Sequence, residues 1–165
     1  MMRSISISRG IRIAAVLAVA IFAAACSNNP AVDPTNPLAT AATPGSAQDF
    51  IVNVGDRVFF EVDSTELTAQ SRDTLEKQAQ WLQRYNRYSF TVEGHADERG
   101  TREYNIALGA RRAQAVREYL VARGIDGARM RTISYGKERP VAVCNDISCW
   151  SQNRRSVTVL NQAGA

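Results

Sequence analysis

The chain has 165 residues, with 20 Lys and Arg against 16 Asp and Glu, one His and three Cys. Three of the arginines (Arg3, Arg9 and Arg12) precede an uncharged apolar run, and without them the charge is 17 − 16, or about +1. Nucleic acid is therefore not an expected partner, because binding it requires basic residues gathered on one face.

The first element is the apolar run itself, residues 13–25, which closes on "AAAC" with Cys26. Thirteen residues are too few to span a bilayer, which takes about 20. Behind a positive segment and before small residues, such a run is typical of a secretory signal peptide. The alternative, a short buried helix, lacks support because no amphipathic period surrounds the run. We expect residues 1–25 to be an export signal.

The segment "FAAACSN" resembles a bacterial lipobox, in which the cysteine becomes the acylated first residue of the mature protein. The resemblance implies a lipid on Cys26. Ser27 stands where an Asp would signal retention in the inner membrane, which implies the outer membrane. Two or more acyl chains hold a protein stably on a bilayer, whereas one holds it marginally. The alternative is a free, unmodified Cys26.

Residues 26–47 are predicted to be the lipidated N-terminus and a flexible tether. The stretch is rich in Pro, Ala and Thr, holds four of the five prolines and has no aromatic residue, so it cannot build a core. Residues 27–47 would span about 25 Å as a coil and about 65 Å in extended polyproline form.

Residues 48–165 are predicted to be one folded domain. Residues 56–62, "DRVFFEV", have the composition of a strand. Thr68 precedes a helical pattern that should end near Asn86. Residues 88–96 then alternate as a second strand.

A second helix is expected from Gly100 to Gly124, where glycine suits a left-handed C-cap. Residues 131–135 and 155–160 are two further strands. The expected buried stripe of this helix is Ile106, Gly109, Ala113, Val116 and Leu120. The order β-α-β-α-β-β predicts an α/β fold, a two-layer sandwich with two main helices on one face of a mixed four-stranded sheet.

Cys144 and Cys149 lie in "CNDISC", in a loop between the last two strands. An exported domain is oxidised, so we expect a disulfide worth about 2 kcal/mol. A structural zinc site is the rival interpretation, but it needs four ligands and the chain has one His. We therefore expect no metal.

The loop "GHADERG", residues 94–100, holds the single histidine and three charged residues. His95, Asp97 and Glu98 lie too close in sequence to meet one metal without contorting the backbone. A hydrolase would need a nucleophile beside a base, or two carboxylates across a cleft. The plainest interpretation is a strand edge at His95 followed by a solvated turn.

The longer segment "GHADERGTREYNIALGARRAQAVREYL" resembles the signature of the OmpA-like peptidoglycan-binding domain. The resemblance continues in "SYGKERP" (134–140) and "NRRSV" (153–157), and so covers the whole domain. Gly109 stands where the family has Ser. The matched positions are Gly94, His95, Ala96, Asp97, Gly100, Asn105, Leu108, Arg112, Ala113, Val116 and Leu120.

The resemblance implies a non-enzymatic protein that binds the stem peptide of peptidoglycan at meso-diaminopimelate. Asp97 would meet the amino group and Arg112 the carboxylate, through a bidentate fork that lysine cannot form. Both side chains are expected at the surface. Asn105 and Arg112 share a face of the helix, and Gly109 between them is expected to leave room for ligand. The full set assigned to the site is Asp97, Arg112, His95, Asn105, Gly109 and Phe60.

Three smaller expectations concern neighbouring residues. Phe59 and Phe60 straddle a strand, so one should face the core and the other the groove, and Phe60 is assigned to the groove. Asn153–Arg155 either orient the acidic residues of the loop or simply flank a strand, and the second is expected. Trp81 and Trp150 are expected to pack rather than hold ligand.

Lipid-anchored members of the family imply the partners: peptidoglycan, TolB and other Tol proteins, with the outer membrane held through the lipid. The role would be to tether that membrane to the wall and support envelope integrity and cell division. No cofactor is expected beyond the lipid on Cys26. Two alternatives stay open, a wall-cleaving hydrolase using Asp97 or Glu98, and the wall domain of a flagellar stator or porin.

Overall fold

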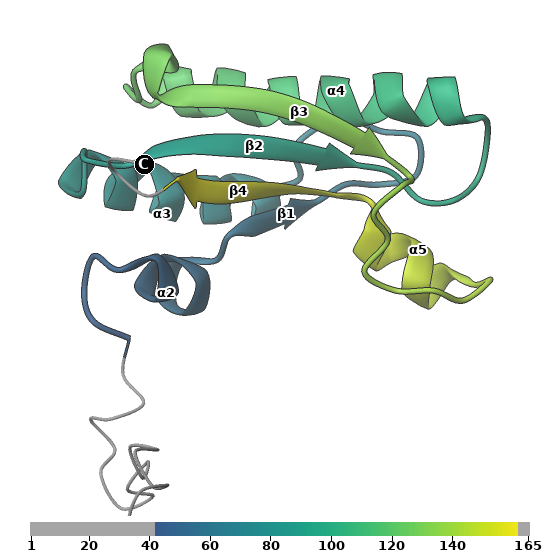
Figure 1. The fold of residues 1–165 in the computed structure, drawn as a ribbon, viewed down its shortest axis with the longest axis horizontal. Helices are drawn as coiled ribbons and strands as arrows, with labels where there is room; N and C mark the ends of the chain where they lie inside the picture. The colour runs from purple at the N-terminus through teal and green to yellow at the C-terminus, as the bar shows by residue number, and fades with distance from the viewer. Residues whose placement is uncertain (1–41, 162–165) are drawn as a thin grey trace, which may run out of the picture. The chain divides into compact units, whose positions relative to one another are not determined.

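The computed structural model describes residues 42–161 (Figure 1). The expected signal peptide, the lipid on Cys26 and most of the tether lie outside these residues. None of the described helices is both long and apolar enough to cross a bilayer. The elements are α2 (Ala47–Asp49), η2 (Phe50–Val54), β1 (Arg57–Phe59), α3 (Ala69–Arg84), β2 (Ser89–His95), α4 (Arg102–Ala122), η3 (Gly127–Arg129), β3 (Met130–Gly136), α5 (Ile147–Asn153) and β4 (Arg155–Asn161).

In the described chain the strands form one sheet in the order β1-β4-β2-β3. β2 pairs in parallel with β3 and antiparallel with β4, and β1 pairs antiparallel with β4. The long helices α3 and α4 lie together on one face of this sheet (Figure 1). The predicted two-layer fold with a mixed four-stranded sheet is confirmed.

Two helix ends follow predicted signals, at Thr68 and Gly124, and Thr101 caps the start of α4 in the same way as Thr68. The hydroxyl of Thr68 accepts a hydrogen bond from Ser71 N at 3.1 Å, and that of Thr101 accepts one from Tyr104 N at 3.2 Å. These bonds satisfy backbone donors that have no partner inside the helix. Gly124 follows α4 with φ of 86°, a left-handed conformation that suits glycine.

The core lies between the helices and the sheet. Its buried apolar residues include Leu75 and Leu82 of α3, Phe90 of β2, and Val116 and Leu120 of α4. The stripe of α4 differs in part from the prediction. Asn105, Leu108 and Arg112 are also buried, while Ile106 is half-buried.

Gly109 has a different role from the one expected. It faces the sheet, and a Cβ there would lie 2.4 Å from Ser134 Oγ and 2.8 Å from Gly94 O. A Cβ on Gly94 would in turn lie 1.8 Å from Gly109 O. The expected room for ligand above Gly109 is therefore wrong. The two glycines let α4 approach β2 closely and so fix the helix that carries the site.

The segment just before α2 is held against the domain. The carbonyl of Gly45 accepts hydrogen bonds from Arg87 Nη2 at 2.7 Å and from Tyr88 Oη at 2.8 Å. The Asp49 carboxylate accepts from Trp81 Nε1 and from Gly45 N, each at 2.8 Å. The folded part therefore begins before residue 48, inside the segment that the sequence assigns to the tether.

The predicted disulfide between Cys144 and Cys149 is present. The surrounding segment is not a plain loop as expected, because it contains α5, which includes Cys149. The Asp146 carboxylate caps this helix by accepting from Ser148 N at 2.7 Å. The disulfide and this cap together fix the start of α5, which carries Trp150 next to Cys149.

Candidate functional site

A pocket of about 330 Å³ opens where β2 ends and α4 begins. Three segments form it: the chain after β1, the loop after β2 and the first turns of α4. The lining residues are Val62, Asp63, Asp97, Arg99, Gly100, Tyr104, Asn105, Leu108 and Arg112.

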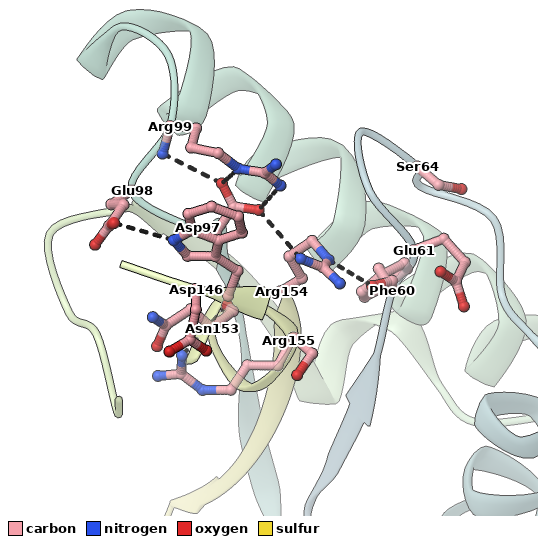
Figure 2. A network of polar contacts seen from close by, with 12 residues as sticks. Phe60, Glu61, Ser64, Asp97, Glu98, Arg99, Asp146, Asn153, Arg154 and Arg155 are labelled. Atoms are coloured by element: carbon pink, nitrogen blue, oxygen red, sulfur yellow. Dashed lines mark hydrogen bonds and ion pairs between the residues drawn. The ribbon is translucent and has the colours of Figure 1, made fainter. Parts of the chain in front are cut away.

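Asp97 is the anion on the inner wall of this pocket. It is 7% exposed, and Figure 2 shows its carboxylate between the guanidinium groups of Arg99 and Arg154. Arg99 Nη2 lies 2.7 Å from Oδ2 and Arg99 Nε 3.1 Å from Oδ1, while Arg154 Nη1 lies 3.3 Å from Oδ2. Burial alone would raise the pKa of this carboxyl, but the hydrogen bonds from Arg99 and Arg154 outweigh it and lower the pKa. Asp97 is therefore ionised at neutral pH, and the expected solvated turn is wrong for this residue.

Arg154 has the less expected of the two roles predicted for residues 153–155, because it contacts an acidic residue of the loop. It is 4% exposed, and its Nε donates to Phe60 O at 3.1 Å while its Nη1 reaches Asp97 (Figure 2). It thus ties the chain after β1 to the loop after β2. Interpreting residues 153–155 as a mere strand flank was wrong. The match of "NRRSV" to the family signature was the sequence feature that pointed to a role.

Arg112 is fully buried, so its expected surface position is wrong. Its three nitrogens donate to backbone carbonyls: Nε to Ser64 O at 2.9 Å, Nη1 to His95 O at 2.9 Å and Nη2 to Glu61 O at 3.1 Å. Burial, followed by the charge of Arg154, lowers its pKa to about 10, so it stays charged at neutral pH. A guanidinium has five N–H groups, so two are not used by these three bonds.

Phe60 is buried in the core and is absent from the pocket lining, so its expected place on the groove wall is wrong. The guanidinium of Arg112 lies over its ring, 5.1 Å from the centroid. Phe59 is the exposed member of the pair, at 45%. Phe60 therefore supports the site from beneath by packing against Arg112.

Asn105 holds the loop rather than facing the pocket freely. Its side-chain amide donates to Arg99 O at 2.7 Å and to Thr101 O at 3.0 Å, and it is 2% exposed. Lys137 secures the same loop by donating to Glu98 O at 3.1 Å and Gly100 O at 2.7 Å. The loop after β2 is thus fixed from two sides.

His95 lies outside the pocket lining. Its ring is 2% exposed, and neither nitrogen has a hydrogen-bond partner within the described chain, although Nε2 lies 3.6 Å from the Glu93 carboxylate. Burial, with the charges of Arg155 and Arg139, lowers its pKa to about 4, so the ring is neutral at pH 7. Its contribution to the site is the backbone carbonyl that Arg112 binds.

The arrangement suits recognition of a molecule that carries both charges. Asp97 and Asp63 supply carboxylates, Arg112 supplies a cation with free N–H groups, and Tyr104 adds a hydroxyl that donates to Asp63. Asp97 pairs with Arg99 and Arg154, not with Arg112. Within residues 42–161, no three His, Cys, Asp or Glu side chains are placed to hold a metal ion.

Comparison with known proteins gives concordant results. The sequence profile of the OmpA family matches residues 59–154. A peptidoglycan-associated lipoprotein from Rhizobium meliloti is 72% identical over 77% of this chain and 72% of its own, and one from Mesorhizobium japonicum is 61% identical over 94% and 92%. The crystal structure of the peptidoglycan-associated lipoprotein from Burkholderia pseudomallei is 42% identical, with a TM-score of 0.63 over 64% of this chain and 90% of that one.

Proposed function

This chain belongs to the OmpA family, and from that premise we propose that it is a non-enzymatic outer-membrane lipoprotein that binds peptidoglycan. The names of its relatives, peptidoglycan-associated lipoproteins, support the proposal. The ligand would be the stem peptide, recognised at meso-diaminopimelate. The result would be a tether between the outer membrane and the cell wall.

The observation that carries the proposal is that two buried side chains of opposite charge, Asp97 and Arg112, line one small pocket. The free end of diaminopimelate is an ammonium and a carboxylate on one carbon, so its receptor needs an anion and a cation a few ångströms apart. Asp97 would take the ammonium, and the two remaining N–H groups of Arg112 would take the carboxylate. Burial of both side chains strengthens each contact because water competes less.

A wall-cleaving hydrolase fits these residues less well. A general acid needs a raised pKa, and the pKa of Asp97 is lowered. Glu98 accepts a hydrogen bond from Trp150 Nε1 at 3.0 Å, which turns its carboxylate toward α5. These contacts support binding without turnover.

Sedimentation with purified cell wall tests the proposal. The purified protein should pellet with wall that contains diaminopimelate and should release no soluble muropeptides. Asp97→Asn should abolish most of the pelleting, whereas Asp73→Asn, the same change on an exposed residue of α3, should not. Muropeptide release would support the hydrolase. If Asp97→Asn pellets as much as the unsubstituted protein, the pocket does not take part in wall binding.

The anchor and the Tol partners complete the proposal. A palmitate analogue should label the protein in cells, and Cys26→Ala should abolish the label and leave unprocessed precursor. Label that persists in that variant would contradict the lipid on Cys26. TolB should compete with wall for the same face, so added TolB should reduce pelleting. Such a protein would support envelope integrity and cell division.

A further inference from the structure

The hydrogen bonds at Asp97 leave no place for a ligand. A carboxylate accepts about four hydrogen bonds, two on each oxygen. Oδ1 accepts from the backbone N of Arg99 at 3.2 Å and from its Nε at 3.1 Å. Oδ2 accepts from Arg99 Nη2 at 2.7 Å and from Arg154 Nη1 at 3.3 Å. An ammonium group can therefore bind Asp97 only if one of these donors leaves.

The four donors differ in how easily they can leave. The side chain of Arg154 is 5% exposed and also holds Phe60 O, so moving it would break the link between two loops. The backbone N of Arg99 is fixed within the turn that Asn105 and Lys137 secure. The side chain of Arg99 is 42% exposed to solvent. Its two bonds are the ones that a ligand can replace.

In the same position, the Arg99 guanidinium also contacts a second partner. The guanidinium lies 4.3 Å from the centroid of the Trp150 ring, and Trp150 is oriented by its hydrogen bond to Glu98. A cation over an aromatic face is stabilised without any hydrogen bond to it. Arg99 can therefore give up Asp97 and keep its contact with Trp150.

We propose that the Arg99 side chain is a latch on Asp97, which a ligand opens by bringing an ammonium group of its own. The inference rests on the proposed function, since it concerns the same pocket. Binding is then an exchange of one cation for another at a buried carboxylate. Asp97 keeps a counterion in both states, so its buried charge is never left with Arg154 alone.

The latch makes Arg99 a residue that lowers the preference of the pocket for a ligand with a distal amine. A ligand with a distal amine can donate hydrogen bonds to Asp97 in place of the two that the Arg99 side chain gives up. A ligand with only the distal carboxylate has no cation to bind Asp97, so Arg99 keeps its hydrogen bonds to Asp97. The latch thus weakens binding of the amine-bearing ligand and leaves binding of the other unchanged.

The test compares two peptides on three proteins. One peptide carries meso-diaminopimelate, and the other carries 2-aminopimelate, which keeps the distal carboxylate and lacks the distal amine. Arg99→Gln removes the latch, and Arg102→Gln makes the same charge change on an exposed residue that pairs with Glu138 instead. Calorimetry on the purified full-length protein and both variants gives the affinities.

Arg99→Gln should bind the diaminopimelate peptide about tenfold more tightly than the unsubstituted protein. The ligand then no longer has to displace Arg99, and a factor of about ten corresponds to one charge-assisted hydrogen bond. It should bind the 2-aminopimelate peptide within about twofold of the unsubstituted protein, because that ligand never opens the latch. Arg102→Gln should match the unsubstituted protein with both peptides. Arg99→Lys, which offers one ammonium in place of a fork, should fall between Arg99→Gln and the unsubstituted protein.

The outcomes separate the latch from the function on which it rests. Equal or weaker binding of the diaminopimelate peptide by Arg99→Gln, with the unsubstituted protein still binding, overturns the latch alone. A similar loss with both peptides assigns Arg99 to holding the loop, which also overturns it. No binding of either peptide by any of the three proteins overturns the proposed function and the latch together.

Discussion

The two ends of β2 lie in opposite kinds of environment. Where the strand begins, Trp81 packs against Phe50, Tyr85 and Tyr88, with ring centroids 4.7 to 5.4 Å apart. Where it ends, polar and charged side chains are buried as well: His95, Asp97, Asn105, Arg112, Asn153, Arg154 and Arg155. The sheet joins these two ends, yet different forces hold them.

The difference lies in how each end tolerates change. Apolar contacts have no required direction, so a side chain of similar volume can replace another at small cost. Each arginine at the polar end instead donates hydrogen bonds to particular carbonyls or carboxylates. Loss of one of these arginines leaves buried polar groups unpaired. A substitution that looks conservative should therefore be mild at one end of β2 and severe at the other.

The largest effect is expected for Arg112→Lys. Lysine keeps the charge, but its three N–H groups leave one nitrogen, whereas the carbonyls of Glu61, Ser64 and His95 each face a different nitrogen of the arginine fork, so at least one should stay unpaired. We expect a loss of about 4 kcal/mol in the free energy of unfolding. Urea denaturation measures it. A loss below about 0.5 kcal/mol is the size expected of a surface residue and would contradict the buried role.

The next effect is a loss of stability in mild acid, caused by His95. Its folded pKa of about 4 lies below its ordinary value of about 6.5, so the unfolded chain takes up the proton first. Stability is therefore full above pH 6.5 and falls as the pH drops from 6.5 to 4, by about 3 kcal/mol.

A matched variant isolates this effect, because His95 is the only histidine in the chain. Phenylalanine resembles a neutral ring whose nitrogens have no partner, so His95→Phe should keep the stability at pH 7 and flatten its dependence between pH 6.5 and 4. An unchanged slope in that variant would assign the acid sensitivity to carboxylates.

Asp97→Asn should cost about 2 kcal/mol at pH 7, because it leaves the charge of buried Arg154 without its anion. The lowered pKa of Asp97 adds a pH dependence of its own, in a lower window than that of His95. Its stabilising charge is present above the unfolded pKa of about 4 and is lost as the pH falls from there through the folded pKa. Thermal unfolding at pH 7, 4 and 2.5 should show the variant and the unsubstituted protein converging in acid. A constant difference across that range would argue against an ionised Asp97.

The smallest effect is expected at the apolar part of the fold. Leu82 is fully buried among apolar side chains, and Leu82→Met conserves volume and apolar character. We expect a loss of about 1 kcal/mol or less in the same urea assay. A loss equal to that of Arg112→Lys would show that packing is as exacting here as the polar network is at the other end.

The sequence predicts the elements well because their signals are local. Apolar periodicity locates α3, α4 and the strands within a few residues, and Thr68 and Gly124 mark helix ends by bonds to near neighbours. The same local rules explain the failure at α5. Its seven residues are too few to establish a helical period, and disulfide geometry carries no helical signal.

The site is less predictable because its contacts are long-range and polar. A hydrophobicity pattern assigns an arginine to the surface, yet Arg112 is fully buried against carbonyls up to 51 positions away. Arg154 and Asp97 meet across 57 positions, which no spacing rule could indicate. The family resemblance predicts Asp97 and Arg112 as partners of a ligand, but it does not indicate what holds them in place.

The hold on Gly45 has a mechanical consequence. Gly45 is bonded beside the start of β2, and Asp97 follows its end, so a pull between membrane and wall would travel along the covalent backbone of an inner strand (Figure 1). The neighbouring strands β3 and β4 would then be loaded in shear, with many hydrogen bonds sharing the force.

The weakest link of this load path is where it begins. Residues 42–49 are held by a few bonds to Gly45 and Asp49, which would break in succession under tension. Their release would add about 25 Å of chain at about 3.3 Å per residue. Under the proposed function, the chain would thus lengthen on the membrane side before tension reached the pocket beyond β2.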